Sequence, residues 1–174
     1  MTFKDNLIQS ALAVGATAVV GTIATKPDSR WYKSLRKPEI QPPAAVFPIA
    51  WTALYGTIIG ASARALTAGE RIADPGPEDS MPTPREHTQA VQRVRNYRRA
   101  LGANLVLNAG WSALFFRGKN MKVAAAEAAL LAASSWDLAR RAGQLDPASG
   151  ALLVPYAGWC TFATVLSARI DAVN

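Results

Sequence analysis

The chain divides into five long apolar stretches separated by shorter polar segments. The stretches cover residues 7–24, 44–66, 100–116, 123–139 and 149–170. A helix that crosses a lipid bilayer needs about 20 apolar residues, with a range of about 17 to 25, so each stretch has or approaches the required length. The pattern therefore predicts an all-α protein with one domain, residues 1–174, built as an integral membrane bundle of five transmembrane helices.

A soluble, alanine-rich bundle is the alternative, and its helices would each need a polar outer face. The stretch 7–24 has no such face, because its polar members are all uncharged, and the stretch 44–66 carries no charge before Arg64 in its last turn. Three stretches are only weakly hydrophobic because they are dominated by alanine, which is nearly neutral on insertion scales. The pattern favours the membrane bundle.

Two connecting segments differ sharply in composition. Residues 31–43 contain Pro38, Pro42 and Pro43, and each proline fixes φ, removes a backbone donor and pushes the preceding residue towards extended geometry. We expect a shaped connection there, with little helix or strand. Residues 67–94 are polar and proline-rich at their centre, which predicts a long mobile linker outside any packed core.

Small residues and basic residues carry less information about the arrangement. Gly56 and Gly60 are one helical turn apart and allow another helix to approach closely, so we expect them to pack within the bundle, with a dimer seam as the other use. In a five-helix topology, ten lysine and arginine residues would lie on the membrane face that holds the N-terminus, and nine would lie on the opposite face. The positive-inside rule needs a bias, so the orientation stays open.

Composition narrows the possible functions. Half of the residues are hydrophobic and 18% are charged, with a net charge of +7, one cysteine and one histidine. A single cysteine excludes an internal disulfide, and a single histidine argues against a histidine metal site. The basic residues lie between apolar segments, so the charge suits a membrane surface and no nucleic acid partner is expected. No metal or required cofactor is expected either.

An aromatic stripe directly follows the proline-rich segment. Phe47, Trp51 and Tyr55 recur at helical spacing and therefore face one way. The preceding segment supplies an aromatic residue, three cations and two prolines: Trp31, Lys33, Arg36, Lys37, Pro42 and Pro43. A rigid basic loop beside an aromatic helix face suits a flat, apolar, anionic ligand.

Two further stretches add candidate ligand contacts. Asn104, Asn108 and Trp111 share one face of the third stretch, where amides must meet protein, water or ligand because lipid offers no partner. Asn104 is equally consistent with interhelical hydrogen bonding and with ligand contact, whereas ligand contact is favoured for Asn108. The fifth stretch adds Tyr156, Trp159 and Phe162. Glu127, inside the fourth stretch, is either functional or paired with a basic residue nearby.

The order of these residues resembles a known family. The pattern W-Y-x-x-L-x-K-P-x-x-x-P-P-x-x-x-F-x-x-x-W-x-x-L-Y covers residues 31–55, and it is followed by Asn108 and Trp111 with Phe115 and Phe116 and then by 152–156 with Trp159. This arrangement resembles the TspO family of tryptophan-rich sensory and translocator proteins, which includes the peripheral benzodiazepine receptor.

The resemblance implies a function as well as a fold. Similar proteins are five-helix bundles that bind porphyrins, cholesterol and benzodiazepine-site ligands, commonly as homodimers. For this chain it implies a multi-pass protein of a bacterial cell membrane that binds protoporphyrin IX or haem. The cholesterol pattern lacks its tyrosine, because Ala168 occupies that position, which leaves a sterol translocator as a weaker alternative.

In the resulting hypothesis, the tryptophans and Tyr55 contact the macrocycle, the asparagines supply polar contacts, and the loop cations attract the propionates while the loop acts as a lid. One alternative is a light-dependent porphyrin-degrading enzyme with Trp51 and Trp159 as electron donors. The other is a transporter or stress-sensing scaffold whose partners use residues 67–94. No acid–base pair or activated nucleophile supports a conventional enzyme.

Overall fold

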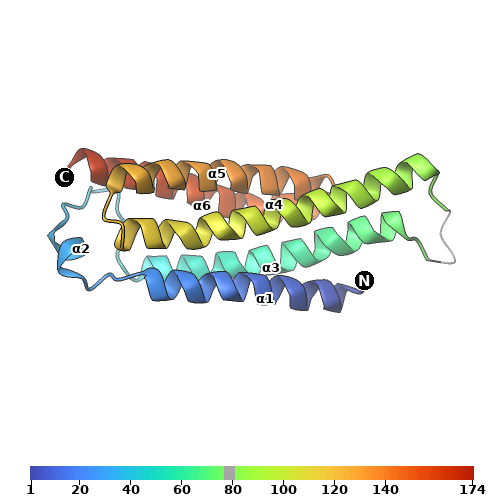
Figure 1. Cartoon of the computed structure of the whole chain (residues 1–174), viewed down its shortest axis with the longest axis horizontal. Coiled ribbons are helices and arrows are strands. Elements are labelled where there is room, and N and C mark those ends of the chain that lie inside the picture. Colours follow the sequence, from blue (N-terminus) through green and yellow to red (C-terminus); the bar gives the residue numbers. More distant parts are fainter. Residues whose placement is uncertain (77–80) are drawn as a thin grey trace.

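The computed structural model describes residues 1–76 and 81–174, and in these the chain is all-α, with five long helices and one short one (Figure 1). The helices are α1 (Phe3–Ala24), α2 (Arg30–Ser34), α3 (Val46–Ala73), α4 (Pro84–Phe116), α5 (Met121–Gly143) and α6 (Pro147–Ala172). The short helix α2 and the C-terminus lie at one end of the elongated bundle, and the N-terminus lies towards the other.

Side-chain caps fix where several helices begin. The hydroxyl of Thr2 accepts a hydrogen bond from the backbone N–H of Asp5, whose carboxylate accepts one back from Thr2, and α4 begins with the same reciprocal arrangement at Thr83. Asp146 caps α6 through the N–H of Ser149. These caps satisfy backbone donors that have no partner inside a helix. Helix α3 is different, because it begins after Ala45 with no side-chain cap.

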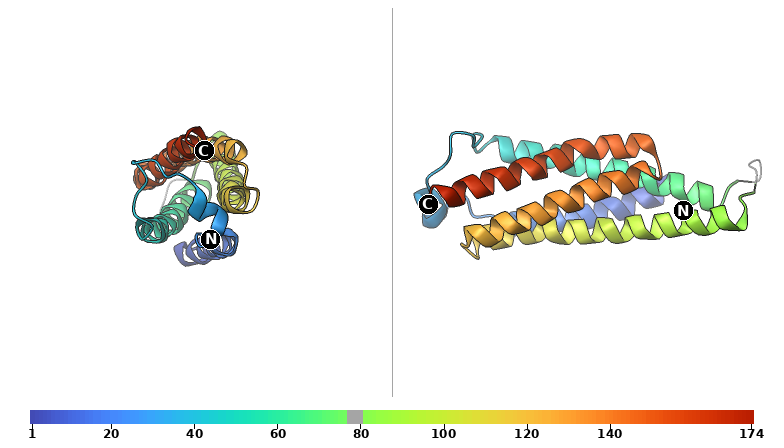
Figure 2. Two further views of the ribbon diagram at one scale, coloured as in Figure 1. Left: turned by 90° about the vertical axis from the view of Figure 1, so that its left-hand side faces the viewer. Right: turned by 90° about the horizontal axis from the view of Figure 1, so that it is seen from above.

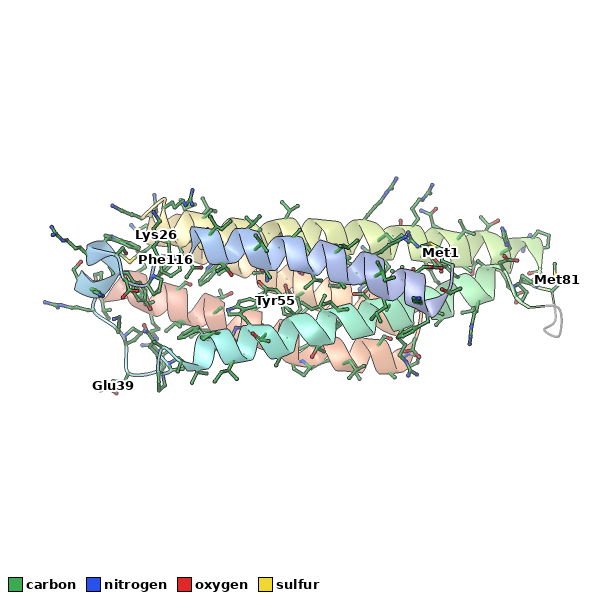
Figure 3. The ribbon with its side chains drawn as sticks, turned by 90° about the horizontal axis from the view of Figure 1, so that it is seen from below. Met1, Lys26, Glu39, Tyr55, Met81 and Phe116 are labelled. Atoms are coloured by element: carbon green, nitrogen blue, oxygen red, sulfur yellow. The ribbon has the colours of Figure 1, made fainter. Side chains whose placement is uncertain are left out.

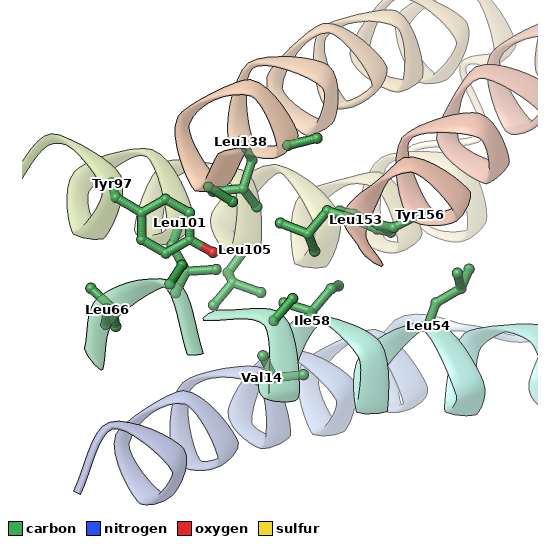
Figure 4. Packing of buried hydrophobic residues seen from close by; sticks show 14 of the residues in the cluster. Val14, Leu54, Ile58, Leu66, Tyr97, Leu101, Leu105, Leu138, Leu153 and Tyr156 are labelled. Atoms are coloured by element: carbon green, nitrogen blue, oxygen red, sulfur yellow. The ribbon is translucent and has the colours of Figure 1, made fainter. Parts of the chain in front are cut away.

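Most of the buried apolar residues form one large core. Helix α5 packs along α6, α1 packs on both α3 and α4, and α3 also contacts α6, so that the long helices surround a common interior (Figure 2). Ile58, Leu138 and Leu153 come from three helices and are completely buried there (Figure 4). A second, smaller cluster lies at the α2 end around Phe115 and Leu166.

The polar segment 67–94 is mostly helical, so the prediction of one long linker is wrong. Helix α3 continues to Ala73, and α4 begins at Pro84. Ala90 and Val94 in this segment, and Tyr97 just beyond it, are buried at helical spacing, and that buried stripe holds the arginine-rich first half of α4 in place. Residues 77–80 of the expected linker lie outside the described residues.

The proline-rich segment has little helix, as expected: residues 31–34 belong to the short helix α2, which Ser29 caps by accepting a hydrogen bond from the N–H of Tyr32, and residues 35–43 are not helical. The expected packing of Gly56 and Gly60 inside the bundle is wrong, since a Cβ built on either would meet no atom of the described residues within 4 Å. They lie on an outward side of α3.

Three of the described helices are long and apolar enough to cross a membrane: α1, α3 and α6. Helices α4 and α5 do not meet that composition. The first half of helix α4 is rich in arginine, and α5 contains many alanines together with Glu127 and Asp137. The fold is therefore an all-α bundle with three membrane-spanning candidates by composition.

Candidate ligand site at the α2 end

The proline-rich segment is fastened to the end of the bundle by aromatic contacts. The ring of Trp31 lies 5.8 Å from that of Phe115, and the ring of Tyr32 lies 5.4 Å from that of Phe116, measured between centroids. Edge-to-face and tilted pairs at this distance contribute about 0.5–1.5 kcal/mol beyond the apolar area they bury. Trp31, predicted as a ligand contact, is thus engaged with α4.

The middle of the same segment is tied to the C-terminal residue. The backbone N–H of Arg36 donates to the side-chain oxygen of Asn174 at 2.8 Å, and the Asn174 amide donates back to the Arg36 carbonyl at 3.0 Å. The segment is therefore held at both α4 and α6 and spans the end of the bundle (Figure 3).

The predicted cations differ in their surroundings. Lys33 forms an ion pair of 3.1 Å with Asp28, and Lys37 lies 4.9 Å above the ring of Tyr32. Arg36 is exposed, and within the described chain its guanidinium forms no ion pair. Of the two predicted prolines, Pro42 is half-buried and Pro43 is exposed just before α3.

The aromatic stripe of α3 faces the aromatic residues of α6. Trp51 lies 5.5 Å from Tyr55 and 6.4 Å from Tyr156, ring centre to ring centre, and Phe47 lies 6.0 Å from Trp159. Phe162 adjoins Trp159 at 5.5 Å. The structure therefore brings the predicted residues of two distant segments together, and Tyr55 marks the middle of the bundle in Figure 3.

A chain of hydrogen bonds joins four helices beneath these rings. The Tyr55 hydroxyl donates to the side-chain oxygen of Asn108 at 2.9 Å, and the Asn108 amide donates to the Tyr156 hydroxyl at 3.2 Å. Tyr156 in turn donates to the side-chain oxygen of Asn104 at 2.7 Å, and the Asn104 amide donates to the Ser135 hydroxyl at 3.0 Å. Asn104 thus serves interhelical bonding, whereas the Asn108 amide keeps one N–H that these bonds do not use.

Unpartnered polar atoms mark the α4–α5 side of the same region. Within the described residues, the indole N–H of Trp111 is buried without a hydrogen-bond partner. Both carboxylate oxygens of Glu127 are also buried without one, so the expected pairing with a nearby basic residue is absent from the described chain. Gly110 faces Glu127, since a Cβ built on it would lie 3.8 Å from a carboxylate oxygen.

Sequence reasoning missed the partners that complete the hydrogen-bond chain. Ser134 and Ser135 both accept from the Asn104 amide, and the Ser135 hydroxyl also approaches the Cys160 sulfur at 3.5 Å. The available signal was a pair of hydroxyls within an apolar stretch, where lipid would leave them without partners.

The helices and the aromatic site together define a class: a multi-helix membrane protein with a tryptophan-rich site at one end of its bundle. Residues 9–173 match the model of the TspO/MBR family, and the chain belongs to that family.

Relatives of known name support the assignment. The chain is 33% identical to a tryptophan-rich sensory protein of Cereibacter sphaeroides, over 93% of this chain and 87% of the relative. It is 28% identical to the tryptophan-rich protein TspO of Chlorobaculum tepidum, over 98% and 99% of the two chains. It is also 28% identical to the translocator protein of Ovis aries, over 81% and 73%.

Proposed function

We propose that the protein crosses a bacterial cell membrane with all five long helices and binds a tetrapyrrole, protoporphyrin IX or haem, at the α2 end. The proposal rests chiefly on one observation, the facing aromatic residues of α3 and α6 beneath a basic, proline-stiffened segment. Helix α4 is 33 residues long, about 50 Å at 1.5 Å per residue. It can therefore cross a hydrocarbon layer of about 30 Å and still extend beyond it.

The aromatic rings supply flat apolar surface of the kind that a macrocycle needs. Trp51, Tyr156 and Trp159 come from two helices, and each ring lies close to another aromatic ring. A tetrapyrrole would enter by separating α3 from α6 at these contacts, replacing ring–ring packing by ring–macrocycle packing. Loss of the direct α3–α6 aromatic contacts is then offset by the larger surface of the ligand.

Polar groups around the rings would orient the ligand. Arg36 and Lys37 are exposed on the segment above the site and carry the charge that two propionates need. The buried N–H of Trp111 has no partner in the described chain and is available as a donor. A few placed polar groups in an apolar setting are typical of small-molecule sites.

The test is titration of protoporphyrin IX into the detergent-purified protein in the dark, followed by tryptophan fluorescence and the porphyrin absorption band. Saturable binding that weakens in Trp51→Phe is expected. Trp136→Phe is the matched control, because Trp136 is exposed on α5 and bonds Thr161 away from the site. Absence of saturable binding, or equal weakening in both variants, would contradict the proposal.

A second experiment tests whether Arg36 and Lys37 pair with the propionates. Arg36→Gln with Lys37→Gln should weaken binding of protoporphyrin IX and leave binding of its dimethyl ester unchanged, because the ester carries no propionate charge. A loss of equal size for both compounds would mean that the segment shapes the site without pairing with propionates.

A second candidate function is light-dependent degradation of the bound porphyrin. The ring of Trp51 lies beside that of Tyr55, whose hydroxyl is hydrogen-bonded to Asn108. Trp51 is thus the candidate electron donor to an excited macrocycle, and dissolved dioxygen would be the oxidant that degradation of the ring requires. Under illumination, a new absorbing product that disappears in Trp51→Phe would favour the enzyme over the binder.

The family resemblance also leads us to propose a homodimer. Gly56 and Gly60 offer an outward strip on α3 where a second copy could approach closely. Replacing both by leucine should convert dimers to monomers in chemical cross-linking within vesicles, whereas the same change at the outward-facing Gly158 should not.

A further inference from the structure

A second feature of the molecule lies at the end opposite α2. There the last turns of α3 and the first half of α4 enclose a groove of about 530 Å³. Its lining is Glu70, Ala73, Val91, Val94, Arg95, Arg98 and Arg99. The lining residues of α4 recur at offsets of three and four, so they form one face of that helix. The groove therefore has an apolar floor of alanine and valine and an arginine-rich rim.

Hydrogen bonds place the inner end of the groove at the membrane boundary. The N-terminal amino group lies 3.3 Å from a carboxylate oxygen of Glu70, and the Asn6 amide donates to the same oxygen at 2.9 Å. Helix α1 has 22 residues, about 33 Å, which matches a hydrocarbon layer of about 30 Å. The first turn of α1 therefore marks one edge of the hydrocarbon layer, and Glu70 lies level with it.

The part of the groove around Arg95 lies at the depth of lipid headgroups, and the outer end of the groove extends slightly beyond them. From Arg98, which bonds Glu70, to Val91 the rise along α4 is about 10 Å. The headgroup layer on one side of a bilayer is about 5–8 Å thick. Arg95 lies about 4–5 Å further out than Arg98, which is where phosphates are found.

The charges of the groove favour an anion. Glu70 is the one acidic residue of the lining, and both of its oxygens are engaged: Arg98 lies 2.6 Å from one, and the amino terminus and Asn6 contact the other. Arg95 and Arg99 are exposed and, within residues 1–76 and 81–174, form no ion pair. The Arg95 guanidinium also donates to the side-chain oxygen of Gln92, but each guanidinium has five N–H donors. The two groups, one turn apart, therefore retain donors that can bind a phosphate.

We propose that this groove binds the headgroup of an anionic phospholipid, with the phosphate at Arg95 and Arg99. Ala73, Val91 and Val94 lie further out than Arg98, so the carbon atoms of a headgroup can cover this floor. A phosphate ion alone would leave it exposed to water, which favours a lipid headgroup over free phosphate. The occupant anchors the projecting α3–α4 hairpin to the membrane surface. This binding is independent of the tetrapyrrole site, which lies at the other end of the bundle.

The test is native mass spectrometry of the purified full-length protein in detergent, with phosphatidylglycerol and phosphatidylcholine offered in equal amounts. The double variant Arg95→Gln with Arg99→Gln removes the free guanidinium groups and leaves the Arg98–Glu70 pair intact. The matched control is Arg85→Gln with Arg93→Gln, which removes the same charge from the same helix outside the groove.

The wild type should retain phosphatidylglycerol in preference to phosphatidylcholine. That preference should fall roughly 30-fold in the groove variant and remain in the control, given the usual contribution of each arginine near an anionic surface. Equal loss in both variants would overturn the proposal in favour of overall charge. Displacement of the lipid by inorganic phosphate would also overturn it, because the site would then recognise phosphate alone.

Discussion

The crossing of α5 and α6 makes a quantitative prediction about one glycine. A Cβ built on Gly150 would lie 2.7 Å from the Cα and 2.9 Å from the nitrogen of Gly143, and 3.0 Å from the carbonyl oxygen of Ala139. All three are backbone atoms, so no side chain can rotate away and the helices themselves must separate. Gly150→Ala should therefore destabilise the bundle.

The size of the effect can be isolated with a control on the same helix. Overpacking of this kind costs about 1–3 kcal/mol, while alanine in place of glycine favours a helix by about 0.8–1.0 kcal/mol. Gly158→Ala has only the gain in helix propensity, since a Cβ there would meet no atom of the described residues within 4 Å. The two variants should thus differ by the overpacking cost, or about 2–12 °C in the unfolding midpoint.

The chain provides its own probe for the assay. Cys160 is the single cysteine, and it is 1% exposed, so a thiol-reactive fluorogenic dye reports the loss of the α5–α6 core during heating. Circular dichroism of the helices provides a second reading that does not depend on the thiol. If Gly150→Ala unfolds at the same temperature as Gly158→Ala, or above it, α5 and α6 are further apart than the structure places them.

Three other changes test the polar interactions by the same assay. Tyr156→Phe should lower stability by about 1–3 kcal/mol, because the Asn104 oxygen is left buried without its donor, and an unchanged midpoint would contradict the hydrogen-bond chain. Glu127→Leu should raise the midpoint, since it removes a buried carboxyl group that has no partner within the described residues, whereas a lower midpoint would reveal a partner. The Arg64 guanidinium, with help from Ser149, lowers the pKa of Asp146 from 3.8 to about 2. The stability from this ion pair is therefore complete above about pH 4 and is lost as the pH falls towards 2, so stability measured across that range should fall less steeply in Arg64→Gln.

The sequence predicted the long helices well because apolar length is a direct signal of a buried or lipid-facing helix. It failed between 67 and 94 because the buried positions there are few. Ala90, Val94 and Tyr97 are separated by arginines and polar residues, and such a stripe is hard to distinguish from a loop when prolines lie nearby. Val94 packs closely on α3 at Gly69. A Cβ built on Gly69 would lie 2.7 Å from side-chain atoms of both Val94 and Leu145, and this close contact holds that part of α4 in place.

The candidate site shows the same division between local and long-range information. Spacing along one helix predicts that Phe47, Trp51 and Tyr55 share a face, and all three lie on the side of α3 that carries the aromatic contacts. Spacing cannot predict that Trp31 packs on Phe115, because that contact depends on how the proline-rich segment folds back over the bundle. It also cannot assign the partner of a buried amide, so the bond between Asn104 and Tyr156 becomes visible only once α4 and α6 are placed together.

The hydrogen-bond chain suggests which helix moves when a ligand enters. Asn108, Tyr156 and Asn104 tie α4 to α6, and Ser135 adds α5. Helix α3 joins this chain through a single bond, from the Tyr55 hydroxyl to Asn108. One interhelical bond in a membrane contributes about 0.6 kcal/mol on average, so opening the α2 end of α3 costs less polar stabilisation than separating α4, α5 and α6 there. The other end of α3 stays tied to α4 by the Ser62–Tyr97 hydrogen bond and the Glu70–Arg98 ion pair. A macrocycle placed between Trp51 and Tyr156 would therefore displace the α2 end of α3, while α4, α5 and α6 keep their arrangement.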